Sequence, residues 1–174
     1  MLRQRCTIWA VLFATTGLVG STQAGSAYLT LTINVDASRT TAEEWYEPIR
    51  TELMAAGNCK IIEENTDSQF TASTRTPLGL ETYVMDVEME REAGKTIYTY
   101  TMKESLQGQL ANQKIRLTFT ETANGTEVTV EMYTKVDSKL APSFIVKQVV
   151  QSCLDGIESF IIENAPTGDR AGDR

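Results

Sequence analysis

The sequence has 174 residues, a formal net charge of −7 and no histidine. An acidic surface repels phosphate backbones, which argues against nucleic acid as a partner. Without histidine the chain cannot form Ser-His-Asp or Cys-His nucleophilic sites, and it lacks the commonest metal ligand. We therefore expect no metal and no cofactor.

The first 24 residues have the layout of a secretory signal peptide. Arg3 and Arg5 precede an apolar stretch from Thr7 to Gly20, and small residues follow up to Ala24. This order of basic, apolar and small segments is typical of a cleaved leader. The apolar stretch is short for a membrane span, and a retained anchor is the alternative.

Cleavage would leave an acidic chain of one domain. It removes two arginines and no acids, so the formal charge becomes −9, from 14 Lys and Arg against 23 Asp and Glu. No later run is apolar enough to cross a bilayer. We predict a secreted or periplasmic protein with a signal peptide over residues 1–24, one domain over residues 25–164 and a disordered tail over residues 165–174.

The predicted domain begins with one strand and a helical region. Every second residue from Ala27 to Ala37 is apolar, which predicts a strand with one buried face. The spacing becomes helical from Ser38 to Gly57, and Pro48 lies inside this region. Because a proline breaks or restarts a helix, we predict two short helices here.

The region after Gly57 alternates apolar and polar residues and predicts six further strands. Short connections between them require antiparallel neighbours. The predicted strands are Cys59–Asn65, Gln69–Thr76, Leu80–Arg91, Lys95–Glu104, Asn112–Thr122 and Glu127–Val136.

The expected turns fix the strand registers, because a hairpin decides which residues share a face. A turn at "PLGL" would place Thr74 opposite Tyr83, and a turn at "EAGK" would place Met89 opposite Tyr98. With an Asn-Gly turn in the last hairpin, the apolar residues stay on one face through three hairpins. The opposite face is largely charged and must meet water.

A long amphipathic helix is predicted from Lys139 to Ile161. A sheet with one apolar face needs a cover, and this is the only long amphipathic helix in the sequence. We therefore expect it to lie on the apolar face. Its apolar stripe consists of Val146, Val149, Val150, Cys153, Ile157 and Phe160.

Two stretches carry a resemblance to a known family. In "TINVDASRTTAEEWYEPI" a strand leads into a helix that bears Trp45, and in "LAPSFIVKQVVQSCLDGIESFI" a proline opens the last helix. Together with the order of elements, they resemble the START-like (SRPBCC) superfamily, which includes polyketide cyclases and lipid-transfer domains. The resemblance implies an α+β helix-grip fold, in which a curved antiparallel seven-stranded sheet wraps around the C-terminal helix. It also implies an apolar cavity between sheet and helix for a hydrophobic small molecule.

Aromatic and thioether side chains on the predicted inner face are the candidates for this cavity. A buried phenol needs a polar partner, which a ligand can supply, and methionine adapts to varied shapes. The alternative is a filled core, since most inward residues simply pack. The candidate ligand-binding residues are Tyr83, Met85, Tyr98, Tyr100, Met102, Phe119, Met132, Phe144 and Val149.

Cys59 and Cys153 are the cysteines that leader cleavage would leave. In an oxidising compartment such a pair suggests a disulfide. Two buried free thiols are the alternative, because cysteine packs well as a small hydrophobe.

These observations predict a protein that binds a hydrophobic small molecule, such as a lipid or polyketide-like compound, by shape and burial. We assign no catalytic residue. One alternative is an enzyme similar to cyclases or hydratases that would use Tyr98 and Tyr100. Another is an interaction module with a filled core. The sequence identifies neither the ligand nor the oligomeric state.

Overall fold

The structure is a computed structural model that describes residues 25–76, 79–136 and 141–166. The predicted signal peptide and most of the predicted tail lie outside these residues, so both stay predictions. Within the described ranges, neither helix combines the length and the apolar character that a membrane crossing requires.

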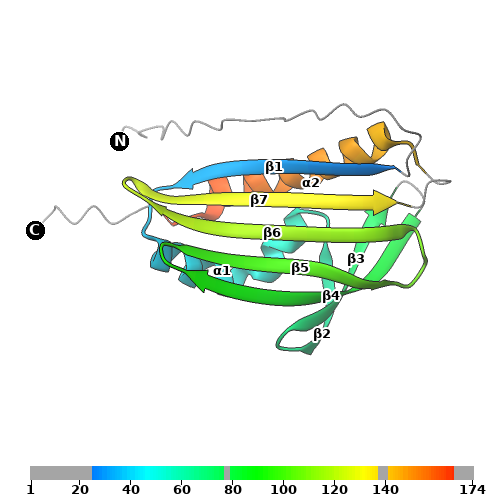
Figure 1. The fold of residues 1–174 in the computed structure, drawn as a ribbon, viewed down its shortest axis with the longest axis horizontal. Coiled ribbons are helices and arrows are strands. Elements are labelled where there is room, and N and C mark those ends of the chain that lie inside the picture. Colours follow the sequence, from blue (N-terminus) through cyan, green and yellow to red (C-terminus); the bar gives the residue numbers. More distant parts are fainter. Residues whose placement is uncertain (1–24, 77–78, 137–140, 167–174) are drawn as a thin grey trace, which may run out of the picture.

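Seven strands and two helices make up the described chain (Figure 1). The strands form a single antiparallel sheet in the order β1-β7-β6-β5-β4-β3-β2. This arrangement confirms the predicted α+β class with a seven-stranded sheet and a C-terminal helix. The elements are β1 (Ser26–Val35), α1 (Arg39–Ala56), β2 (Lys60–Thr66), β3 (Gln69–Thr76), β4 (Gly79–Glu92), β5 (Lys95–Ser105), β6 (Leu110–Thr122), β7 (Gly125–Val136) and α2 (Ser143–Asn164).

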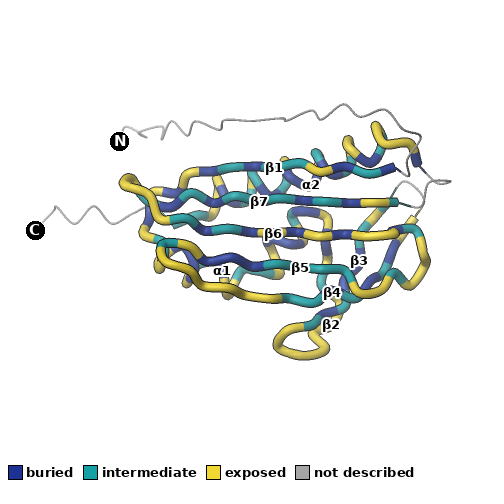
Figure 2. The backbone as a smooth tube through the Cα atoms, viewed as in Figure 1, coloured by how far each residue is buried: buried dark blue, intermediate teal, exposed yellow. Residues whose placement is uncertain are grey.

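The sheet has one buried face, as its period-two pattern requires. In β7, Val128, Val130 and Met132 are buried, whereas Thr129 and Glu131 between them are partly exposed. The same alternation runs along β6, and β2 at the sheet edge is mostly exposed (Figure 2). Helix α2 lies behind the sheet along β1 and β7, so the predicted cover of the apolar face is confirmed (Figure 1).

Two of the three predicted hairpin registers are correct, those of β4–β5 and β6–β7, and the β3–β4 register is shifted. Met89 lies opposite Tyr98, as expected. Thr74 lies opposite Glu81 rather than Tyr83, because β3 and β4 stay paired up to Thr76 and Gly79. A shift of two residues leaves each side chain on its own face, so the one-sided pattern survives.

Helix α1 corrects the prediction of two short helices. It is continuous over 18 residues, with Pro48 inside it. Proline removes the hydrogen bond to the carbonyl of Glu44, but both residues are exposed, so that carbonyl can meet water. Tyr46 and Leu53 are buried on either side of the proline, and their packing offsets its cost of about 3 kcal/mol.

The two helices touch through glycines. A Cβ atom at Gly156 of α2 would lie 2.2 Å from the carbonyl oxygen of Ala56, at the end of α1. A Cβ atom at Gly57 would lie 2.8 Å from the side chain of Ile157. At these two positions the helices are therefore too close for a side chain to fit between them.

The substitution Gly156→Ala tests this contact. In an exposed helix the change would stabilise by about 1 kcal/mol. Here we expect it to lower the free energy of unfolding by about 1–3 kcal/mol, because the new methyl group meets backbone that cannot turn aside. Urea denaturation measures the effect, with Ser159→Ala on the exposed face of α2 as the control. A stabilised Gly156→Ala protein would contradict the close approach.

Candidate ligand-binding cavity

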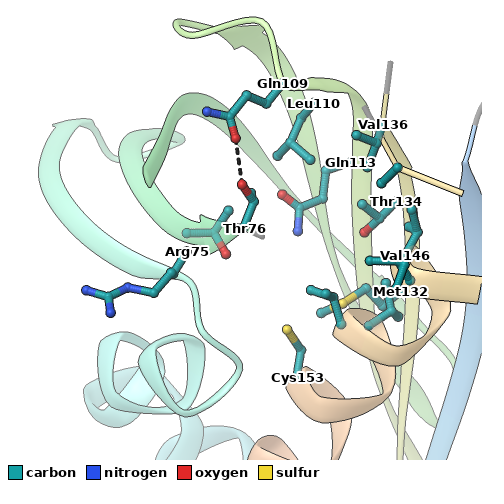
Figure 3. Close-up of a pocket in the computed structure, with 15 residues that line it drawn as sticks. Arg75, Thr76, Gln109, Leu110, Gln113, Met132, Thr134, Val136, Val146 and Cys153 are labelled. Atoms are coloured by element: carbon teal, nitrogen blue, oxygen red, sulfur yellow. Dashed lines mark hydrogen bonds between the residues drawn. The ribbon is translucent and has the colours of Figure 1, made fainter. Parts of the chain in front are cut away.

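A cavity lies between the first half of α2 and one end of the sheet (Figure 3). Its walls come from the end of β3, the start of β6, the end of β7 and α2 with the residues just before it. The cavity has a volume of ≈ 50 Å³. It is therefore small.

Most of the lining is apolar. Aliphatic and thioether groups face the hollow from three sides, which suits the alkyl part of a ligand. The apolar lining residues are Leu110, Met132, Val136, Ala141, Ile145, Val146, Val149 and Val150.

The polar lining groups are uncharged apart from one arginine. Arg75 is exposed, and its guanidinium group points away from the other lining residues (Figure 3). Burial raises the pKa of the Cys153 thiol to about 11, which keeps it neutral at pH 7. The remaining polar lining residues are Thr74, Thr76, Gln109, Gln113 and Thr134.

A buried carboxylate positions the β5–β6 connection at this end of the sheet. Glu81 is 0% exposed and accepts hydrogen bonds from the Ser105 hydroxyl (2.6 Å) and from the backbone N–H groups of Gln107 and Gln109 (3.1 Å each). Thr76 donates to the side-chain oxygen of Gln109 over 2.6 Å (Figure 3). These contacts tie the β5–β6 connection to β3 and β4 and hold Gln109 in the cavity wall.

The structure places two of the nine predicted ligand-binding residues, Met132 and Val149, in the cavity wall. Phe144 is 63% exposed, which corrects its expected position. It lies outside the stripe of α2 that faces the cavity, in which Ile145 and Val149 recur at helical spacing.

The other predicted residues lie in a filled part of the interior. Tyr46 of α1 packs against Tyr98 and Phe119, with ring centroids 4.9 and 5.4 Å apart. None of the described cavity-lining residues belongs to this group. Its members are Tyr83, Met85, Tyr98, Tyr100 and Phe119, which are buried, and Met102, which is partly buried.

The buried tyrosines find their polar partners within the protein. The hydroxyl groups of Tyr46 and Tyr100 hydrogen-bond to each other, and Tyr98 donates to Glu47 over 2.6 Å. Burial raises the pKa of the tyrosine phenols above the ordinary value, that of Tyr100 to about 12, so they are protonated at neutral pH. These hydroxyl groups therefore have hydrogen-bond partners without a ligand.

A separate ionic cluster lies near the start of β5, at the other end of the sheet from the cavity (Figure 1). Glu43 accepts hydrogen bonds from Arg39 and from the Thr96 hydroxyl, and Arg91 lies 3.8 Å from it. Opposite charges pair in this cluster, and the buried Nε of Arg39 has no hydrogen-bond partner among the described residues. In the described chain, no three His, Cys, Asp or Glu side chains gather as a metal site would require.

Both cysteines of the domain are free and buried, so the possible disulfide is not formed in the structure. The Cys59 sulfur accepts a hydrogen bond from the Tyr83 hydroxyl over 3.2 Å. Cys153 instead lines the cavity from α2. The two thiols pack as small hydrophobic groups, which was the alternative prediction.

The sequence analysis did not identify Gln113, a buried polar residue in the cavity wall. It occupies an inward position of β6, two residues before Ile115, and is 7% exposed. A glutamine in phase with the apolar residues of a strand was the available signal, because polar residues seldom occupy that face without a partner.

No protein-family model matches the sequence, and no curated protein matches it. Solved structures are similar to it in fold. A START superfamily protein from Mycobacterium smegmatis has a TM-score of 0.58 and 16% identity, over 79% of this chain and 96% of that one. A STAR-related lipid transfer protein fragment from Xanthomonas axonopodis has a TM-score of 0.55 and 13% identity, over 89% of this chain and 98% of that one.

At such low identities, structural similarity establishes the fold and nothing finer. In this chain the fold consists of an open, curved antiparallel sheet and a helix at the C-terminal end. The chain therefore has the START-like helix-grip fold that its order of elements predicts.

Proposed function

We propose that the protein binds a hydrophobic small molecule, a lipid or polyketide-like compound, in the cavity beneath the first half of α2. The observation that carries this proposal is an apolar hollow between the first half of α2 and one end of the sheet. Each CH₂ group that enters such a site contributes about 0.8 kcal/mol. The lipid-transfer name of the Xanthomonas axonopodis protein, which has the same fold, supports the same class of ligand.

The small enclosed volume limits the ligand. A cavity of ≈ 50 Å³ accepts a short chain or a narrow part of a larger molecule. We infer that a ligand inserts its apolar end and leaves the remainder near the mouth.

The positions of the tyrosines favour a carrier over an enzyme. An enzyme similar to cyclases was expected to use Tyr98 and Tyr100. Both are engaged with Glu47 and Tyr46 outside the cavity lining. Among the described lining side chains, burial raises the pKa of the Cys153 thiol to about 11, far from the range that suits acid–base work near pH 7.

We also propose that the protein is exported, on the basis of its N-terminal sequence. The basic, apolar and small segments up to Ala24 support a cleaved leader. Intact-mass measurement of protein expressed with its own N-terminus in a secreting host should give a chain that begins at Gly25. A chain that keeps Arg3 and Arg5 would favour the retained anchor.

Filling the cavity tests the proposed function. Val149 lines the hollow and is partly buried, so Val149→Phe should occupy the ligand's place. We expect it to weaken binding of the fluorescent apolar probe N-phenyl-1-naphthylamine by about tenfold or more, from the burial lost to the probe. Fluorescence titration of the purified protein measures this affinity.

Ser152→Phe is the matched control, because it adds the same side chain to the exposed face of α2. It should bind the probe as the wild type does. Thermal unfolding of each variant verifies that the fold is retained, and Ile145→Phe offers a second way to fill the hollow. Equal probe binding by wild type and both filled variants would place the ligand elsewhere and favour an interaction module with a filled core.

A further inference from the structure

We propose that the ligand is an uncharged amphipathic molecule whose polar end donates a hydrogen bond, through a hydroxyl or N–H group, to the side-chain oxygen of Gln113. This inference rests on the proposed function and specifies which hydrophobic molecules the cavity selects. Alcohols and primary or secondary amides with an alkyl chain have the required chemistry.

The first observation is an unpartnered amide in the cavity wall. Gln113 is 93% buried, and its side-chain oxygen has no hydrogen-bond partner among the described residues. Thr134 lies directly opposite on β7 and also lines the cavity, yet it does not supply the missing donor. Figure 3 shows the amide among the lining side chains, between Thr76 and Cys153. The terminal torsion of glutamine is soft, so a modest rotation presents the oxygen to a ligand.

The second observation is the charge of the lining. Arg75 is the single charged residue among the described lining groups, and it points away from them (Figure 3). Cys153 is neutral at pH 7. A carboxylate at Gln113 could accept a hydrogen bond from the amide N–H but would lack a cationic partner, so burial would oppose its charge. Burial does not oppose an uncharged donor in this way.

The third consideration is the effect of Gln113 on the empty protein. A buried acceptor without a partner destabilises the folded state, and an apolar side chain of the same shape would remove that penalty. A binding residue is expected to lower stability in this way, whereas a residue with a purely structural role is not. Replacing Gln113 by an apolar residue is therefore expected to raise the stability of the empty protein and to reduce its preference for ligands that donate a hydrogen bond.

The test compares two probes of nearly equal size, 1-decanol and decyl methyl ether, as competitors of N-phenyl-1-naphthylamine. Wild-type protein should bind the alcohol about fivefold to tenfold more tightly than the ether, because the alcohol alone donates to Gln113. In Gln113→Met the preference should reverse, because the alcohol then loses its hydrogen bonds to water without replacement. Decanoate at pH 8 should compete more weakly than 1-decanol with the wild type.

The substitution Gln148→Met is the matched control, because Gln148 is exposed on α2 and outside the cavity lining. It should keep the wild-type preference for the alcohol. Thermal unfolding without ligand gives a second readout, in which Gln113→Met should have a higher Tm than the wild type. A lower Tm would indicate that the amide serves the fold.

Two failures are distinguishable. If the wild type binds the alcohol and the ether equally, or if Gln113→Met keeps the preference for the alcohol, the role of Gln113 is wrong while the cavity still binds apolar molecules. If the wild type binds none of the fluorescent probe, the alcohol and the ether, the proposed function itself is wrong.

Discussion

Two close backbone contacts fix α2, one to Gly25 just before β1 and one to Ala56 at the end of α1. Before α2, a Cβ atom at Gly25 of the sheet side would lie 2.2 Å from the carbonyl oxygen of Ala141. Near its C-terminal half, Gly156 approaches Ala56 equally closely. Between these two points the inward side chains of α2 are small or medium in size, chiefly Val146, Val149 and Cys153. They are too short to fill the space above β6 and β7, and the cavity is the result.

The interior is divided into two parts with different chemistry. Beneath α1, aromatic rings pack on one another and their hydroxyl groups are hydrogen-bonded within the protein. Beneath the first half of α2, the walls are aliphatic and one amide oxygen lacks a partner. Close packing in the first part gives stability, whereas the second part leaves room and one polar group for a guest. This division connects the fold to the proposed binding function.

The sequence was most informative where hydrophobic period and short turns act together. Alternation from β3 to β7 predicted a sheet with one buried face, and the Met89–Tyr98 register followed from the length of one turn. Pro48 was misleading because the break that proline favours locally is overridden by packing on both sides of it. The β3–β4 register depended on how far pairing continues into the turn, which residue type alone does not determine.

The candidate site was harder to predict than the fold. Period two identifies which face is buried, but it does not tell which end of that face is filled and which is hollow. The aromatic residues were predicted as ligand contacts, but Tyr46 of α1 packs against Tyr98 and Phe119. Gln113 was not predicted as a ligand contact, because the lack of a partner for its amide oxygen is apparent only once β7 and α2 lie beside it.

The central claim is that α2 spans a real apolar hollow. A crystal of the purified protein exposed to xenon tests it directly, because xenon occupies dry apolar cavities without needing a specific ligand. We predict a xenon atom between α2 and β7, in contact with Val149 and Met132. Absence of xenon there, with the side chains of α2 packed onto β6 and β7, would contradict the account.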